Sequence, residues 1–128
     1  MVDASAERRI LVVDDDPEIC DLLATMIATE GHVADTAADG HAALEKIAAR
    51  DYNLILCDII MPGLDGAGLY EALQRRWPHL LGRLVFISGF ADALDERLRR
   101  FIAQNNVPII SKPFKRAQIS EAIKGKEY

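Results

Sequence analysis

The stretch LVVDDDPEI, residues 11–19, joins an apolar run to three consecutive carboxylates and a proline. Its first three residues and the isoleucine before them form an unbroken aliphatic run, typical of a strand that a parallel sheet buries on both faces. Asp16 and Pro17 fit the N-cap and first position of a helix, because Asp accepts free amide hydrogens and Pro has none to donate. Asp14 therefore follows the carboxyl end of a predicted strand, and neither Asp14 nor Asp15 has a structural reason of this kind.

The same alternation of strand and helix recurs along the chain. Strands are predicted at residues 10–13, 32–36, 53–58, 83–89 and 107–114. The second of these is weak and partly polar, which suits a sheet edge. Between and after the strands, apolar residues recur with helical spacing in five segments, the second opened by Asp39 and Gly40. Five βα units in succession predict an α/β fold, a doubly wound parallel sheet with helices on both faces.

Size and composition restrict the class of protein. The 128 residues fit one domain, which we expect at residues 9–126 after a flexible tail at residues 1–8. The tail has no apolar core of the kind found in secretory signals, and no run of about 18 apolar residues predicts a membrane span. The net charge of −5 disfavours direct nucleic-acid binding. We therefore expect a cytoplasmic protein without a membrane partner.

The cysteines and histidines give no metal or disulfide pattern. Cys20 and Cys57 are the two cysteines, they lack CxxC spacing, and Cys57 lies in an apolar run. Both are expected to be buried and reduced rather than ligands or disulfide partners. The three histidines are isolated in the sequence, and without a second ligand at helical spacing we interpret them as surface residues.

Chemically reactive side chains collect where the predicted strands end. The first strand is followed by Asp14 and Asp15, the third ends in Asp58, the fourth in Ser88 and the fifth in Lys112. Ligands of open α/β sheets bind outside the carboxyl ends of the strands. Three carboxylates placed together repel one another, so the arrangement favours a bound cation. Hard oxygen ligands of this kind suit Mg²⁺, which also keeps positions for phosphate oxygens.

A lysine and a hydroxyl beside a carboxylate cluster match the needs of phosphoryl transfer. Asp58 is the predicted nucleophile, because a carboxylate that attacks phosphorus forms an acyl phosphate. Lys112 would supply positive charge and Ser88 a hydrogen bond to the phosphate oxygens. Each residue alone is weak evidence, since single Asp and Lys residues are commonly caps or solvent-facing groups. Their joint placement at four strand ends carries the prediction.

The motifs VVDDD, LCDIIMPGLDG, FISG and KPF, spread over residues 12–114, resemble those of response-regulator receiver domains of two-component signalling. The resemblance implies a flavodoxin-like fold with strand order 2-1-3-4-5. It implies that Asp58 is the phosphoacceptor, Ser88 the switch hydroxyl and Lys112 the phosphate-contacting lysine. The implied metal is Mg²⁺, with ligands from Asp14, Asp15, Asp58 and the backbone carbonyl of Ile60. A cis Lys112–Pro113 bond is also implied.

The sequence departs from the resembled family at one position. Receivers often have Tyr or Phe three residues before the lysine, whereas this chain has Ile109. The resemblance therefore does not imply the usual coupled aromatic switch for this chain, whereas it does imply the phosphorylation chemistry. Ile60 and Phe90 are bulky apolar residues beside the expected site, for which simple packing and a tuned role are both open.

The resemblance implies a signalling role. The phosphoryl group would come from a sensor histidine kinase or a histidine phosphotransfer domain, and a downstream protein target would read the response. The domain would catalyse only its own phosphorylation and dephosphorylation, and it could be a stand-alone receiver or part of a hybrid kinase. The alternative is an Mg²⁺-dependent phosphohydrolase with an aspartate nucleophile, but such enzymes place the nucleophile at the first strand. A flavodoxin-like FMN carrier is disfavoured because three acids would repel the FMN phosphate.

Overall fold

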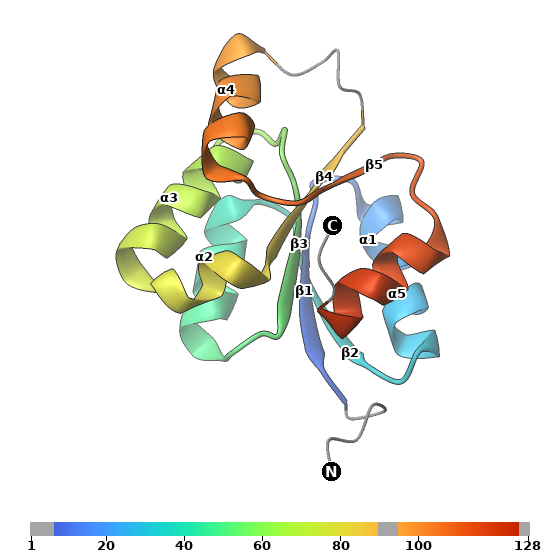
Figure 1. Ribbon diagram of the computed structural model, residues 1–128. Helices are drawn as coiled ribbons and strands as arrows, with labels where there is room; N and C mark the ends of the chain where they lie inside the picture. Colours follow the sequence, from blue (N-terminus) through green and yellow to red (C-terminus); the bar gives the residue numbers. More distant parts are fainter. Residues whose placement is uncertain (1–6, 90–94, 126–128) are drawn as a thin grey trace.

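The computed structural model describes residues 7–89 and 95–125, which form a five-stranded parallel sheet of order β2-β1-β3-β4-β5. The strands are β1 (Arg9–Val13), β2 (Val33–Ala37), β3 (Leu54–Asp58), β4 (Leu84–Ser88) and β5 (Ile109–Ser111). The α-helices are α1 (Pro17–Thr29), α2 (Gly40–Ala49), α3 (Gly66–Arg76), α4 (Glu96–Asn105) and α5 (Arg116–Lys124). Helices α1 and α5 cover one face of the sheet, while α2, α3 and α4 lie on the other side (Figure 1). The predicted fold class and strand order are confirmed.

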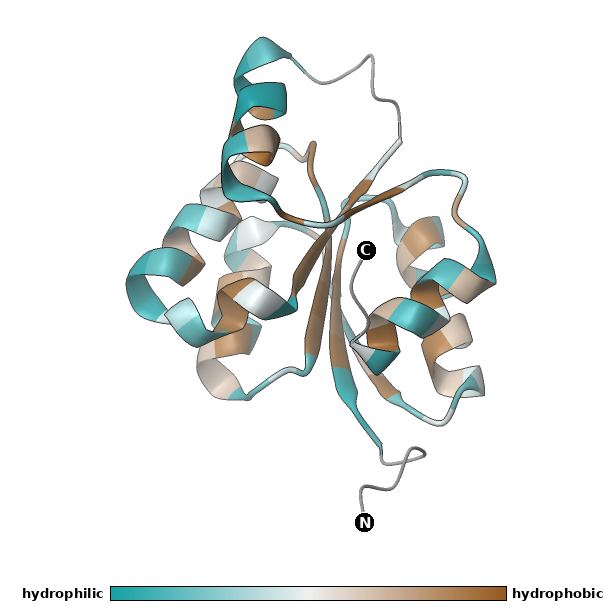
Figure 2. Cartoon of the chain, in the orientation of Figure 1, coloured by the Kyte–Doolittle hydropathy of each residue, from teal (hydrophilic) through white to brown (hydrophobic). Residues whose placement is uncertain are grey.

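Alternate residues of each central strand point into two separate apolar cores. In β1, Leu11 and Val13 belong to the core under α2 and α3, whereas Ile10 and Val12 belong to the core under α1 and α5. All four side chains are fully buried, and the strands appear as continuous hydrophobic bands in Figure 2. Burial on both faces is the physical reason why these strands read as unbroken apolar runs.

The predicted helix starts at Asp16 and Asp39 are confirmed. The Asp16 side chain accepts a hydrogen bond from the Glu18 backbone amide at 2.9 Å, and the Asp39 side chain accepts one from the Ala42 amide at 2.7 Å. After α1, Gly31 adopts a φ of 87°, a conformation that glycine adopts at little steric cost. The strand-to-helix connections are thus fixed by local chemistry.

Several predicted boundaries differ from the structure. The last strand is predicted over residues 107–114 but pairs only at Ile109–Ser111. The Lys112–Pro113 bond that follows is cis, as the resemblance implies. A 3₁₀-helix, η1 (Pro78–Arg83), precedes β4 where no element was predicted. Leu22 fits the apolar spacing of α1, yet it is 49% exposed. The apolar marker Leu94 of the fourth helix lies outside the described residues.

Both cysteines are buried and free, as expected. Burial raises the pKa of the Cys20 thiol and raises that of Cys57 further above its ordinary value. Raised thiol pKa values favour the protonated, unreactive form. Within the described part of the chain, every helix is too short or too polar to span a membrane.

Candidate functional site

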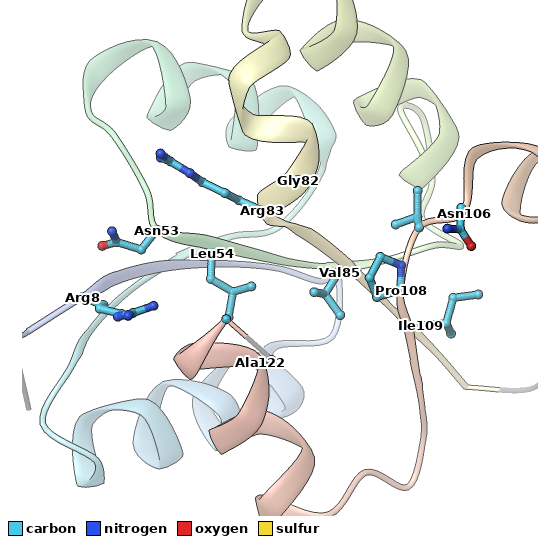
Figure 3. Close-up of a pocket in the computed structure, with 12 residues that line it drawn as sticks. Arg8, Asn53, Leu54, Gly82, Arg83, Val85, Asn106, Pro108, Ile109 and Ala122 are labelled. Carbon is cyan, nitrogen blue, oxygen red and sulfur yellow. The ribbon is translucent and has the colours of Figure 1, made fainter. Parts of the chain in front are cut away.

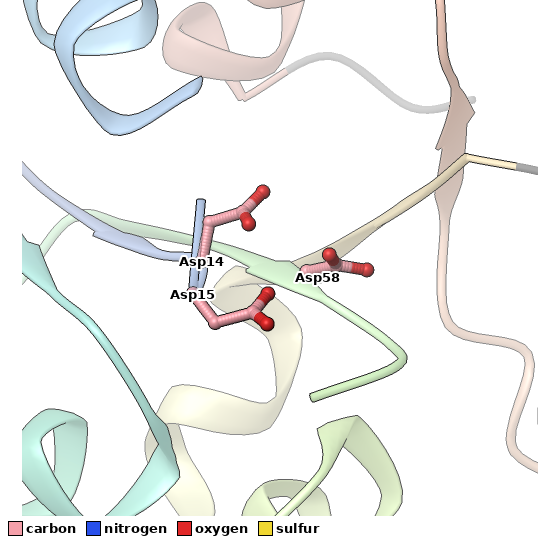
Figure 4. Close-up of side chains that lie close together, drawn as sticks. All are labelled: Asp14, Asp15 and Asp58. Atoms are coloured by element: carbon pink, nitrogen blue, oxygen red, sulfur yellow. The ribbon is translucent and has the colours of Figure 1, made fainter. Parts of the chain in front are cut away.

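The carboxyl ends of β1 and β3 bring the three predicted acidic residues together. These strands are direct parallel neighbours, so Asp14, which follows β1, lies beside Asp58, the last residue of β3. Carboxylate oxygens of Asp14, Asp15 and Asp58 all lie within 4.8 Å of one another, and the three side chains converge on a common space (Figure 4). The structure therefore assembles the cluster that the sequence pattern predicted.

Asp14 is the buried anchor of this cluster. Its side chain is 2% exposed, and its Oδ1 atom accepts a hydrogen bond from the Asp16 backbone amide at 2.9 Å. Its Oδ2 atom accepts one from Lys112 Nζ at 3.2 Å. Asp15 is exposed in the same turn. The cluster is thus buried and hydrogen-bonded at Asp14 and open to solvent at Asp15.

The pKa of Asp58 is set by burial and by neighbouring charges of both signs. Its side chain is 12% exposed, which raises its pKa, and the nearby Asp14 carboxylate raises that pKa further. Lys112 and the backbone amide of Ile60, which donates to Asp58 Oδ1 at 3.2 Å, oppose the rise. The net shift is upward, so the carboxylate is more basic than an ordinary Asp and well placed to accept an electrophile or a cation.

Lys112 bridges the two buried carboxylates. Its Nζ atom lies 3.2 Å from Asp14 Oδ2 and 3.4 Å from Asp58 Oδ2, and its side chain is 22% exposed. Burial alone would lower the pKa of Lys112, but the Asp58 and Asp14 carboxylates raise it, so the ammonium group stays charged. One lysine cannot neutralise three carboxylates. The remaining negative charge and the hard oxygen donors fit a divalent cation such as Mg²⁺.

Ser88 is the predicted site residue at the carboxyl end of β4. It is the last residue of β4 and is 6% exposed. Among the described residues, its hydroxyl is the one buried side-chain oxygen or nitrogen without a hydrogen-bond partner. A buried hydroxyl without a partner is costly, so a ligand that accepts its hydrogen would be favoured. Gly89 follows and leaves space beside the lysine, while Phe90 lies outside the described residues.

Tight packing fixes the loop between β3 and α3. This loop carries Ile60, whose side chain is 45% exposed at the rim of the site. Leu64, in the same loop, packs against the first residue of α2, Gly40. A Cβ atom at Gly40 would lie 2.6 Å from the Leu64 carbonyl oxygen, so only glycine allows this approach. The sequence pattern does not predict this contact, because close approaches between separate segments are not encoded in local spacing.

An apolar surface beside Lys112 was not predicted. A cavity of about 360 Å³ is lined by Ile19 and Leu22 of α1, Gly89, Lys112, Pro113 and Phe114. Leu22 fits the helical spacing of the apolar residues of α1, so spacing alone does not mark it as exposed. Its exposure indicates a contact surface.

A larger cavity among the described residues contains none of this chemistry. It measures about 750 Å³ and includes Asn53, Arg83 and Pro108, which immediately precede β3, β4 and β5 (Figure 3). It therefore opens at the amino ends of the strands and contains no member of the acidic cluster. We assign the site by its convergent charged groups rather than by volume.

Comparison with known proteins identifies similar domains. The family model of the response regulator receiver domain matches residues 10–124. The chain is 41% identical over 123 residues to the transcriptional regulatory protein TcrA of Mycobacterium tuberculosis, covering 82% of this chain and 49% of that protein. It is 40% identical over 107 residues to the nitrogen assimilation regulatory protein NtrX of Azorhizobium caulinodans, covering 82% and 23%. The chain thus spans about half or less of these curated relatives.

The structural comparison agrees with the sequence comparison. A CheY-like response regulator receiver domain protein from Methanospirillum hungatei superposes with a TM-score of 0.79 at 30% sequence identity. The alignment covers 93% of this chain and 92% of that one. The similarity therefore extends over the whole sheet and its helices.

Proposed function

Because this chain belongs to the response regulator receiver domain family and is a phosphoacceptor module of two-component signalling, we propose that Asp58 is its phosphoacceptor residue. The observation that carries the assignment is the bridge from Lys112 to both Asp14 and Asp58 within a cluster of three carboxylates. A histidine kinase or histidine phosphotransfer domain is the proposed donor, and a downstream protein is the proposed target.

The proposed transfer is a displacement at phosphorus. An oxygen of the Asp58 carboxylate forms a bond to phosphorus as the bond from phosphorus to the donor's histidine nitrogen breaks, and the imidazole leaves with the bonding electron pair. Asp14, Asp15, Asp58 and the Ile60 carbonyl would hold Mg²⁺, which when bound neutralises charge on the approaching phosphoryl group. Lys112 provides a fixed positive charge beside Asp58, and Ser88 provides a hydroxyl donor that has no partner in the described structure.

Incubation of the protein with acetyl phosphate and Mg²⁺ tests this proposal. Intact-mass spectrometry should show the addition of one phosphoryl group, and fragment analysis should place it at Asp58. No addition, or addition at another residue, would contradict the assignment. The comparisons give no support to the phosphohydrolase alternative, and turnover of a phosphate monoester would be needed to revive it. Because TcrA is named a transcriptional regulator, the expected lack of nucleic-acid binding stays a prediction.

Ile60 is proposed to slow the loss of the phosphoryl group. Hydrolysis needs a water molecule in line with phosphorus, and an exposed isoleucine beside Asp58 offers that water no hydrogen bond. Ile60→Asn should therefore accelerate dephosphorylation roughly two- to tenfold, the kinetic equivalent of one hydrogen bond of about 0.5 to 1.5 kcal/mol. Decay of the phosphorylated protein is measured after removal of the donor. Ile60→Leu is the control and should leave the rate near that of wild type; an unchanged or slower decay of the Asn variant counts against the idea.

The exposed apolar surface is proposed to receive the phosphodonor protein. Leu22 projects beside Lys112 in the cavity already described, so a partner seated there would present its phosphohistidine close to Asp58. Leu22→Glu should reduce phosphotransfer from the cognate kinase, identified by profiling a kinase panel, roughly tenfold or more. Phosphorylation by acetyl phosphate should not change, because that donor needs no docking surface.

Ala49→Glu provides a matched control for the docking experiment. Ala49 is exposed at the end of α2, on the opposite face of the sheet. The control variant should transfer at the wild-type rate. Equal transfer in wild type and Leu22→Glu, or an equal loss in both variants, would exclude the surface around Leu22 as the docking site.

A further inference from the structure

Among the five α-helices in the described part of the chain, α4 buries the fewest residues. Its one buried residue is Leu98, with Phe101 and Ile102 partly buried against the core, whereas α1 and α5 each bury three residues and α3 buries five. One turn further on, the Phe101 ring meets the edge of Tyr70 on α3 at a centroid distance of 5.1 Å. Figure 1 shows α4 standing beside one end of α3. A helix with so little buried area depends on its few specific contacts for its position.

One of these contacts is an ion pair with the loop that follows Asp58. Arg97, in the first turn of α4, donates to Asp65 Oδ2 at 3.1 Å. The other oxygen of Asp65 accepts the Gly68 amide at 2.9 Å and caps α3. Asp65 is 22% exposed and Arg97 is 64% exposed. The Asp65 carboxylate is thus held rigidly by α3, while the arginine reaches it from α4.

The ion pair joins two segments that both begin at the phosphorylation site. Asp65 ends the loop that starts at Asp58, and that loop is fixed at its base by a hydrogen bond from the Gly66 amide to the Ile59 carbonyl oxygen. Helix α4 follows the chain that leaves β4 at Ser88. A movement of Ser88 toward a phosphoryl group that also shifted α4 would therefore pull Arg97 away from Asp65.

We propose that the Asp65–Arg97 ion pair is a latch that holds α4 against α3 before phosphorylation and opens when Asp58 is phosphorylated. The proposal rests on the proposed function of Asp58. A contact present only in the unphosphorylated state opposes phosphorylation by its own free energy. Loss of the latch should therefore favour binding of beryllofluoride, which stands in for the phosphoryl group on Asp58.

Two variants remove the latch without removing a helix cap. Asp65→Asn keeps an N-cap side chain, since Asn caps helices as well as Asp, and Arg97→Gln keeps a long polar side chain. Each should raise beryllofluoride affinity in the presence of Mg²⁺ about two- to fivefold, the range of a solvent-exposed ion pair. The double variant should match either single variant, because both remove the same interaction. Without any ligand, amide hydrogen exchange in α4 should accelerate by a similar factor.

Arg100→Gln is the matched control. Arg100 is also on α4 and is 65% exposed, but its partner is Glu96 on the same helix. This variant should leave beryllofluoride affinity unchanged, and it should alter α4 exchange less than the latch variants do, because an exposed pair within one helix stabilises that helix only slightly. Three results would overturn the latch: unchanged α4 exchange in both latch variants, an equal effect in Arg100→Gln, or faster exchange without a gain in beryllofluoride affinity. If wild-type protein does not bind beryllofluoride, the proposed function of Asp58 is wrong. Amide hydrogen exchange in α4 still tests whether the ion pair holds the helix in place.

Discussion

Asp58→Asn is expected to abolish phosphorylation by acetyl phosphate. The amide is nearly the same size as the carboxylate, but its nitrogen and its neutral oxygen are poor nucleophiles toward phosphorus. Lys112 keeps its second partner, Asp14, so the fold around the site should survive. Chelation of Mg²⁺ by EDTA should abolish labelling of wild-type protein as well, because charge repulsion then opposes the donor. Intact-mass spectrometry measures the phosphorylated fraction in both cases.

The control for this variant is Asp51→Asn. Asp51 is 71% exposed and lies before β3, at the amino ends of the strands. It should label as fully as wild type. Full labelling of Asp58→Asn would show that another carboxylate is the acceptor, and labelling of wild type in EDTA would show that the acidic cluster works without a divalent cation.

Lys112→Ala is expected to slow phosphorylation by roughly a hundredfold, the effect of removing one charged group that stabilises a transition state. The variant also leaves Asp14 and Asp58 side by side without their shared cation. Because Lys112 lowers the pKa of Asp58 in wild type, its loss should raise that pKa further. The nucleophile is the ionised carboxylate. On acidification, the phosphorylation rate should therefore begin to fall at a higher pH in the variant than in wild type.

Initial rates with acetyl phosphate, measured from neutral to mildly acidic pH, test both effects. Lys124→Ala serves as the control, since Lys124 is an exposed lysine in the last turn of α5. It should keep the wild-type rate and pH profile. If Lys112→Ala reacts at the wild-type rate, the lysine is only a structural counter-ion of the two carboxylates.

The elements that sequence reasoning placed correctly are those fixed by local chemistry or by burial on both faces. The strand before Asp14 and the helix cap at Asp16 fall into this class. Parallel strands deliver their carboxyl ends to one edge of the sheet, which predicts that Asp14 and Asp58 lie at the same edge. That β1 and β3 are direct neighbours there was implied by the resemblance to receiver domains and is confirmed.

The features that were missed depend on contacts between distant segments. Leu22 shares the helical spacing of the buried residues of α1, and periodicity cannot tell which apolar residue lies at the margin of the buried stripe. The sequence LDG indicated a turn but could not show that Asp65 caps α3 and reaches Arg97 at the same time. The same limit applies to η1, whose position depends on packing between α3 and β4.

The two separate cores put the proposed docking surface and the proposed α4 latch on opposite sides of the sheet. Ile19 and Phe114, which flank the proposed docking surface, pack against the core under α1 and α5. Phe101 of α4 packs against the other core. Substitutions that share no contacts have nearly additive effects on stability. This separation would allow the two surfaces to evolve independently. After gene duplication, substitutions on α1 could match one copy to a new kinase while its surface around α4 stays unchanged. Such a change would limit unwanted signalling between pathways.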